Sequence, residues 1–254
     1  MKNQRNIFLV SMLFIAGTTD AAGGENQQDG FFPPEVYMSN ILFTLVEDQS
    51  VEDKRLDTVL GEAVRHLNYK KVNQLLDMTS AIDEVNNFGE SALMIAASNG
   101  DIEMLELLLQ RGANINLSTN CKGTALSQAA RHNKLNSVRF LLNHGAMVDK
   151  GADFFNNMTP LQEAVRHGNV SIIEELLKRG VNPNVQEGFC KTFPLKNAVI
   201  FGHFASVLAL LNGGANINAG CGFLNETALH EVAKRGKVDL AIILLKYKAN
   251  PFLT

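Results

Sequence analysis

Few residues of this chain have the type and spacing that chemistry requires. His230-Glu231 resembles the start of a zinc-protease helix, in which a second histidine follows three residues after the glutamate. Lys234 occupies that place here, so a metal role for His230 is not predicted. The sequence also has no phosphate-binding glycine loop, nucleophile elbow or pair of cysteines two residues apart. We therefore predict that the chain is not an enzyme and holds no metal or cofactor.

Two kinds of binding residue recur at long, regular intervals. Basic or histidine pairs occur at four places: Arg65-His66, Arg131-His132, Arg166-His167 and Lys234-Arg235. Three phenylalanines are spaced 34 residues apart, with a fourth beside the first: Phe154, Phe155, Phe189 and Phe223. Arginine forms paired hydrogen bonds with carboxylates, and aromatic side chains are frequent anchors of protein interfaces. Their recurrence indicates that a repeated structural unit positions both sets.

The repeated unit is marked by two independent landmarks in the same register. The first is a leucine at intervals of 33, 35, 34 and 34 residues: Leu93, Leu126, Leu161, Leu195 and Leu229. The second is a Gly-Ala-like pair that keeps the same intervals, beginning at Gly112, Gly145, Gly180, Gly214 and Lys248. Two landmarks in step predict a tandem repeat.

Each unit is predicted to contain two helices and a projecting turn. In the clearest copy, Asn87 to Asn116, the Ser91 hydroxyl can cap a short helix that Asn99-Gly100 ends. An apolar face from Ile102 to Leu109 predicts a second helix, and Gly112 suits a left-handed turn after it. The Asn-rich residues that follow favour a turn. One helix pair cannot bury both its faces, so neighbouring pairs must stack.

These residues resemble the ankyrin repeat, whose Thr-Pro-Leu-His-x-Ala signature is approximated by Thr159 to Ala164 and by Thr227 to Ala233. The resemblance covers residues 57–254. It implies an all-α ankyrin-repeat solenoid of about six repeats, the first of them degenerate. Phe193 replaces the capping threonine of one copy, where Thr192 could cap one residue earlier. In the last copy Ile242 holds the place of Glu106, so an apolar spot could remain at that end.

In this family the end of the first helix lies toward the concave surface, which would place the four basic pairs in one row. Such a row would favour an acidic protein partner. Polar or basic residues are also common at this position in the family without binding a partner. The phenylalanines fall in the projecting turns, where they would either offer a partner an apolar edge or pack against each other. Both alternatives stay open for each set.

Three cysteines, Cys121, Cys190 and Cys221, fall in turns. An odd number permits at most one internal bridge. Cys190 and Cys221 lie in neighbouring turns, and an oxidising compartment would favour a disulfide between them. Against this, stacked repeats lie about 10 Å apart, whereas the Cα atoms of a disulfide lie within about 7 Å. The bridge is therefore a hypothesis.

The N-terminal segment predicts export. Lys2 and Arg5 precede an apolar run from Ile7 to Ala16, and small residues suited to cleavage near Ala21 or Ala22 follow. A buried helix and a permanent membrane anchor are the alternatives, although about ten apolar residues fall short of a bilayer span. No later run is a transmembrane candidate. We assign residues 1–21 to a signal peptide, 22–34 to a flexible spacer and 35–56 to an N-terminal capping helix and linker.

The composition argues against nucleic acid as a partner, because 23 Lys and Arg against 26 Asp and Glu leave a net charge of −3. The predicted function is a non-catalytic protein-binding scaffold, exported from a bacterial cytoplasm and secreted or periplasmic. It would use the concave helix surface and the turn tips. The target would be a host protein if the source is host-associated, and an envelope protein otherwise. The alternative is an accessory subunit that supports a partner enzyme in the bacterial envelope.

Overall fold

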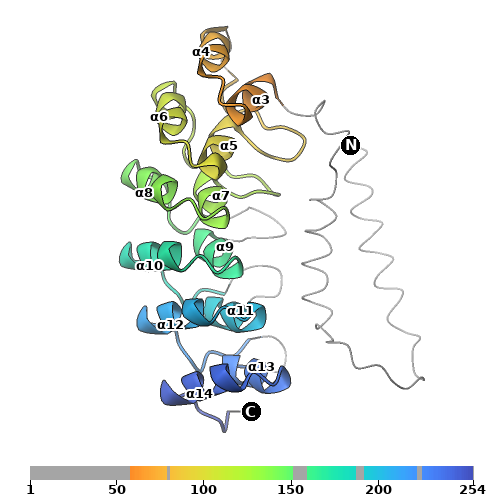
Figure 1. The fold of residues 1–254 in the computed structure, drawn as a ribbon, viewed down its shortest axis with the longest axis vertical. Helices are drawn as coiled ribbons and strands as arrows, with labels where there is room; N and C mark the ends of the chain where they lie inside the picture. Colours follow the sequence, from red (N-terminus) through yellow and green to blue (C-terminus); the bar gives the residue numbers. More distant parts are fainter. Residues whose placement is uncertain (1–57, 79–80, 151–158, 187–191, 222–224, 254) are drawn as a thin grey trace, which may run out of the picture. The chain divides into compact units, whose positions relative to one another are not determined.

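The computed structural model describes residues 58–78, 81–150, 159–186, 192–221 and 225–253, which form twelve α-helices in six successive pairs (Figure 1). The predicted signal peptide, spacer and capping helix lie outside these residues. The pairs are α3 (Val59–Arg65) with α4 (Tyr69–Met78), α5 (Ala92–Asn99) with α6 (Ile102–Gln110), α7 (Ala125–Arg131) with α8 (Leu135–Asn143), α9 (Pro160–Arg166) with α10 (Val170–Lys178), α11 (Pro194–Phe201) with α12 (Phe204–Asn212), and α13 (Ala228–Lys234) with α14 (Val238–Lys246).

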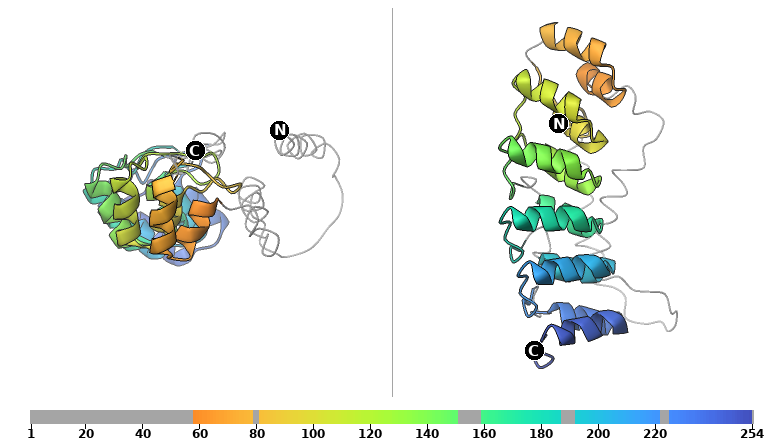
Figure 2. Two further views of the ribbon diagram at one scale, coloured as in Figure 1. Left: turned by 90° about the horizontal axis from the view of Figure 1, so that it is seen from above. Right: turned by 60° about the vertical axis from the view of Figure 1, so that its left-hand side comes forward.

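The pairs stack in chain order. Each first helix packs on the first helix of the next pair, from α3 on α5 to α11 on α13, and also contacts the second helix of its own pair. Figure 2 shows the pairs one above the next, and Figure 1 shows the first helices and the second helices in two separate rows. The predicted all-α solenoid is confirmed for the described residues.

A continuous core runs through the six pairs. Each first helix from α5 to α11 buries its landmark leucine to 3% exposure or less, and each carries a fully buried alanine one turn later. These alanines are Ala96, Ala129, Ala164 and Ala198. A side chain this small lets the backbones of neighbouring helices approach closely, which explains why the sequence keeps alanine there. The second helices complete the core with leucine, isoleucine and valine.

The starts of the first helices follow the predicted capping pattern, except at α11. The Ser91 hydroxyl accepts a hydrogen bond from Met94 N, and the threonines before α3, α7 and α9 cap in the same way. Phe193 is the N-cap residue of α11 and makes no side-chain hydrogen bond. The suggested cap by Thr192 is therefore wrong, because the extended residue that begins the helix is one position later.

The turn after each second helix from α6 to α14 uses a left-handed residue, as the glycines at this position predict. Gly112 has a φ of 91°, and the matching glycines of the next three repeats have φ values between 84° and 90°. In the last repeat Lys248 takes this conformation with a φ of 67°. A residue with a Cβ pays about 1 kcal/mol for it, so the last turn is the most strained of the set.

Asparagine side chains tie the turns of successive repeats together. Asn184 Oδ1 accepts a hydrogen bond from Asn216 N, and Asn218 Oδ1 accepts one from Asn250 N in the next pair of turns. Asn116 does the same for Met147 N. The asparagines at this place in the repeat therefore connect one turn to the next. Within the described ranges, no helix has the length and apolar character needed to cross a membrane.

Candidate functional site

The four basic pairs occupy one structural position, the C-terminal end of α3, α7, α9 and α13. We call these eight residues the basic row: Arg65, His66, Arg131, His132, Arg166, His167, Lys234 and Arg235. The same position carries Ser98-Asn99 in α5 and Ile200-Phe201 in α11, so the row is interrupted twice. Because α7 packs on α9, the structure brings the second and third pairs next to each other and leaves the outer two apart.

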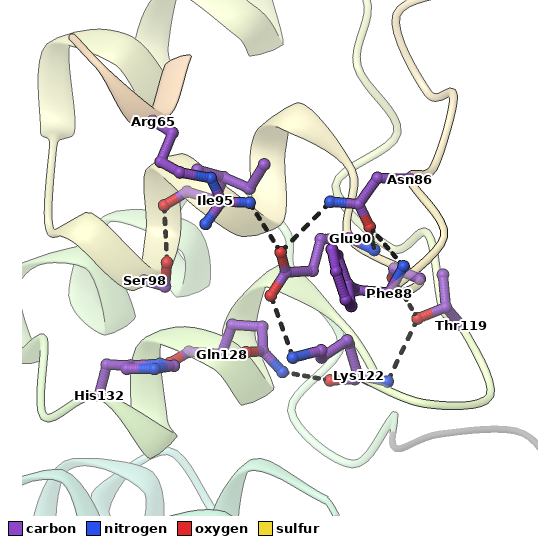
Figure 3. A network of polar contacts seen from close by, with 11 residues as sticks. Arg65, Asn86, Phe88, Glu90, Ile95, Ser98, Thr119, Lys122, Gln128 and His132 are labelled. Carbon is purple, nitrogen blue, oxygen red and sulfur yellow. Dashed lines mark hydrogen bonds and ion pairs between the residues drawn. The ribbon is translucent and has the colours of Figure 1, made fainter. Parts of the chain in front are cut away.

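Carboxylates of the same chain meet the basic row, beginning with Glu90 (Figure 3). Arg65 Nη2 lies 3.0 Å from Glu90 Oε2, and Lys122 Nζ lies 3.1 Å from Glu90 Oε1. Asn86 contacts Glu90 twice, since its Nδ2 donates to Glu90 Oε2 at 3.4 Å and its Oδ1 accepts a hydrogen bond from the backbone N–H of Glu90 at 2.8 Å. Burial alone would raise the pKa of Glu90, but Lys122 and Arg65 outweigh it and keep that pKa below its ordinary value. Glu90 is therefore a carboxylate shared between three repeats.

Glu226 plays the same part at the other end of the stack. It directly precedes the cap of α13, as Glu90 directly precedes the cap of α5. Lys196 Nζ lies 3.4 Å from Glu226 Oε2, and Lys234 pairs with Oε1. The hydrogen bond from Lys234, opposed by burial and assisted by Lys196, lowers the pKa of Glu226.

Two further carboxylates lie one turn before the basic pairs on their own helices. Glu231 pairs with Arg235, and His167 Nε2 lies 3.6 Å from the buried Glu163 Oε2. The guanidinium carbon of Arg166 lies 5.9 Å from the ring centroid of Phe201, within the range of a cation–π contact. Carboxylates thus lie beside several members of the basic row, which is therefore not a uniformly positive strip.

The His132 ring lies at the end of α7, in the middle of the row. Its Nδ1 lies 3.0 Å from the carbonyl oxygen of Gln128. Partial burial lowers the pKa of His132, the bond to Gln128 opposes this, and the positive charges of Arg131 and Lys122 lower the pKa further. A neutral ring in the middle of the row would let this place accept apolar or hydrogen-bonding contacts as well as charge.

The four carboxylates were missed by reasoning from the sequence. Glu90 and Glu226 could have been noticed in the sequence, because each stands immediately before the capping residue of its repeat. Their partners Arg65 and Lys196 are 25 and 30 residues earlier in the chain, and only the stacking of the helices brings them within contact distance. Such pairings depend on side-chain length and direction, which a repeat alignment does not contain.

The other predicted site residues are only partly described. Phe154, Phe155, Phe189, Phe223 and Cys190 lie outside the described residues. Cys221 is buried, with 4% of the residue exposed, and its Sγ lies 3.8 Å from the carbonyl oxygen of Glu226. The Cys190–Cys221 bridge and the phenylalanine edge therefore stay predictions.

His230 has a local structural role. Thr227 N donates a hydrogen bond to His230 Nδ1 at 3.2 Å, and the Thr227 hydroxyl lies 2.9 Å from the same nitrogen. The two residues form a reciprocal capping box at the start of α13. In the part of the chain that the structure describes, no three His, Cys, Asp or Glu side chains are placed to share a metal ion.

Comparison with known proteins agrees with this architecture. The family model described as "Ankyrin repeats (3 copies)" matches residues 36–119 and 116–187, and the model described as "Ankyrin repeat" matches residues 224–254. These matches cover most of the chain, which therefore belongs to the ankyrin-repeat family. Ankyrin repeats are generally protein–protein interaction modules.

Similar proteins come from several kingdoms. The chain is 31% identical over 144 residues to "Probable E3 ubiquitin-protein ligase XBOS33" of Oryza sativa subsp. japonica, a match to 52% of this chain and 28% of that protein. It is 30% identical over 154 residues to the B-cell lymphoma 3 protein homolog of Mus musculus, covering 59% and 34%. It is 35% identical over 95 residues to the tyrosine-protein kinase Shark of Drosophila melanogaster, covering 37% and 10%. The chain thus matches about a third or less of the length of each relative. The ligase and kinase activities named for two of these relatives are therefore not assigned to this chain.

Proposed function

We propose that the chain is an exported, non-catalytic scaffold that binds a protein partner along the first-helix ends and the projecting turns. The observation that carries this proposal is the basic row. Stacking sets side chains from different repeats side by side, so that α7 and α9 together present Arg131, His132, Arg166 and His167. A partner that spans two repeats would touch all four.

An acidic partner fits this surface best. Arginine and histidine of the middle repeats supply donors for carboxylates. The packing of α7 on α9 sets two of the four pairs side by side, which supports the middle of the row as the place of contact.

A capture experiment tests the scaffold. The chain is immobilised, its partner is isolated from the native compartment and purified, and the affinity is then measured at two salt concentrations. We expect a saturable complex that weakens as salt rises, because exposed charge pairs are screened by ions. A complex insensitive to salt would refute the acidic-partner assignment.

The second candidate is an accessory subunit that supports a partner enzyme in the bacterial envelope. An accessory subunit and a scaffold differ in their effect on the turnover of a partner enzyme. If the captured partner is an enzyme, an accessory subunit changes its turnover at saturating substrate, whereas a scaffold changes only its location or its assembly with other proteins. A turnover unchanged by a saturating amount of the chain would reject the accessory role.

Export is the remaining part of the proposal, and it is supported by Lys2, Arg5 and the apolar run from Ile7 to Ala16. Sequencing the N-terminus of the protein recovered from its native source should show cleavage near Ala21. An intact Met1 on purely cytosolic protein would refute export. If the protein is exported and its source is a host-associated bacterium, the proposed target is a host protein. If the source is free-living, the proposed target is an envelope protein.

A further inference from the structure

The solvent-facing side of the second helices changes from charged to apolar along the stack. In the middle of the stack the fifth residue of each second helix is charged and exposed: Glu106 in α6, Arg139 in α8 and Glu174 in α10. The equivalent residues of the last two repeats are Leu208 in α12 and Ile242 in α14. Ile242 is 59% exposed. The apolar place expected from the sequence at Ile242 therefore extends to the preceding repeat.

The residues one turn earlier enlarge this apolar surface. Phe204 is 43% exposed on α12, and Val238 is 66% exposed on α14. The two helices are neighbours in the views of Figures 1 and 2, and the Tyr247 hydroxyl after α14 donates a hydrogen bond to Asn212 Oδ1 at the end of α12 at 3.1 Å. We call Phe204, Leu208, Val238 and Ile242 the outer patch. Phe204, Val238 and Ile242 are exposed and Leu208 is half-buried, so α12 and α14 both carry accessible apolar side chains at this place in the repeat. Exposed apolar surface gathered on one side of a protein marks an interaction site.

Charges around the outer patch identify what would cover it. No residue of α12 is charged, and the exposed residues Asp239 and Lys246 lie on either side of Ile242 along α14. Asp239 stands three residues before Ile242 and Lys246 four residues after it, so all three face the same side of the helix. When two such helices run antiparallel about a twofold axis at Ile242, Asp239 of each lies across from Lys246 of the other. The surface is therefore complementary to itself.

We propose that the outer patch is a self-association surface, on which a second copy of this chain docks with its α14 antiparallel to the first. The apolar residues meet at the centre, and two Asp239–Lys246 ion pairs close the two ends. The contact uses second helices, whereas the proposed partner binding uses the ends of the first helices and the turns. The two proposals can therefore succeed or fail separately.

The size of the outer patch sets the expected strength. Each helix has nine residues and so is about 14 Å long and about 10 Å wide, which gives two adjacent helices a face of about 300 Å². Stable interfaces bury about 800 Å² on each partner. We therefore expect a weak monomer–dimer equilibrium that depends on protein concentration.

Sedimentation of the full chain over a wide concentration range tests the proposal. The weight-average mass should rise from that of one chain toward that of two. Leu208→Glu with Ile242→Glu, which restores the acidic character of α6 and α10 at this position, should weaken dimerisation at least tenfold. Asn136→Glu with Ser171→Glu adds two charges to exposed places on α8 and α10 and should leave dimerisation unchanged. Melting temperatures of all variants are compared to confirm that they fold.

Charge reversal tests the antiparallel arrangement. Asp239→Lys alone and Lys246→Asp alone should each weaken dimerisation, because like charges would then face each other across the axis. An equimolar mixture of the two variants should associate again, since both ion pairs of the mixed dimer are restored with reversed sign. A single-chain mass at every concentration overturns the proposal, as does a dimer that survives Leu208→Glu with Ile242→Glu. A mixture that associates no better than its components overturns the antiparallel pairing.

Discussion

The ammonium group of Lys122 lies 3.1 Å from the carboxylate of Glu90, and this ion pair joins the start of the second repeat to the turn that leads into the third. Their side chains are 17% and 18% exposed, so water screens the pair less than it would screen a pair on the open surface. Arg65 of the first repeat binds the other oxygen of the same carboxylate. One acidic residue thus links three repeats.

Replacing Glu90 by glutamine should lower the free energy of unfolding by about 1.5 to 3 kcal/mol at neutral pH, the value of hydrogen bonds to a charged group. The pKa of Glu90 lies below its ordinary value, so its contribution is complete above the ordinary carboxyl range of about pH 4 and is lost as the pH falls through the lowered folded value. Urea unfolding at pH 7 and in acid should show the difference between wild type and Glu90→Gln shrinking at the lower pH.

The control for this measurement is Glu174→Gln, which removes the same charge from an exposed place on α10. Its effect should stay within about 0.5 kcal/mol at both pH values. A difference between Glu90→Gln and wild type that is the same at pH 7 and in acid would show that the charge of Glu90 does not stabilise the stack.

A second prediction concerns Asn169, whose side chain crosses from the fourth repeat to the third. Its Nδ2 donates to the carbonyl oxygens of Ala130 at 2.7 Å and Arg131 at 3.2 Å, and the residue is only 9% exposed. Asn169→Ala removes the donor from buried carbonyl groups at the end of α7 and should cost about 1 to 3 kcal/mol. Thermal unfolding measures this. A change below about 0.5 kcal/mol would show that water replaces the amide without loss.

Interactions between residues close in the sequence were predictable, whereas interactions between repeats were not. The cap at Ser91 and the left-handed turn at Gly112 were predictable, because each involves residues a few positions apart. The bond from Asn169 to Ala130 and the Glu90 ion pairs were not, because they join different repeats and require the stacking distance and side-chain direction. The outer patch lies between these cases. Alignment of the repeats placed Ile242 at the position of Glu106 and so predicted an exposed apolar residue. Leu208 was not recognised in the same way, because most residues of α12 are apolar and its accessible position does not differ in type from its core positions.

A third prediction separates backbone strain from steric contact at two glycines. Gly112 has a φ of 91° and open space where a Cβ would be, whereas a Cβ on Gly168, with a φ of 70°, would lie 2.9 Å from His203 Nδ1. Gly112→Ala should therefore cost about 1 kcal/mol from strain alone. Gly168→Ala should cost more, because it also displaces the His203 ring, whose Nε2 lies 2.9 Å from the Arg166 carbonyl oxygen.

A double-mutant cycle checks the steric part. The penalty of Gly168→Ala should fall toward that of Gly112→Ala when it is measured in a His203→Ala background, because the clashing ring is then gone. Equal penalties for Gly168→Ala with and without His203 would mean that the ring moves aside freely.

Two double variants distinguish the basic row from the phenylalanine edge as the binding surface. For each variant, the affinity for the purified partner is measured. If the basic row carries binding, Arg131→Ala with Arg166→Ala should weaken the complex and reduce its salt dependence. Lys70→Ala with Lys178→Ala removes the same charge from exposed places on the second helices and is the matched control. A loss of affinity equal to that of the control would attribute the effect to net charge and reject the basic row as the site.

If the phenylalanine edge carries binding instead, Phe155→Ala with Phe189→Ala should cost more than the arginine variant, since buried aromatic anchors each contribute about 2 kcal/mol or more to a complex. The salt dependence should then stay at its wild-type value, because no charge has been removed. Phenylalanines that only pack against each other predict the opposite result, a lower melting temperature with unchanged affinity at temperatures where the chain stays folded. Unchanged affinity in both the arginine and the phenylalanine variants, with unchanged melting, would place the partner on neither surface, and the recurrence of these residues would then reflect the repeat alone.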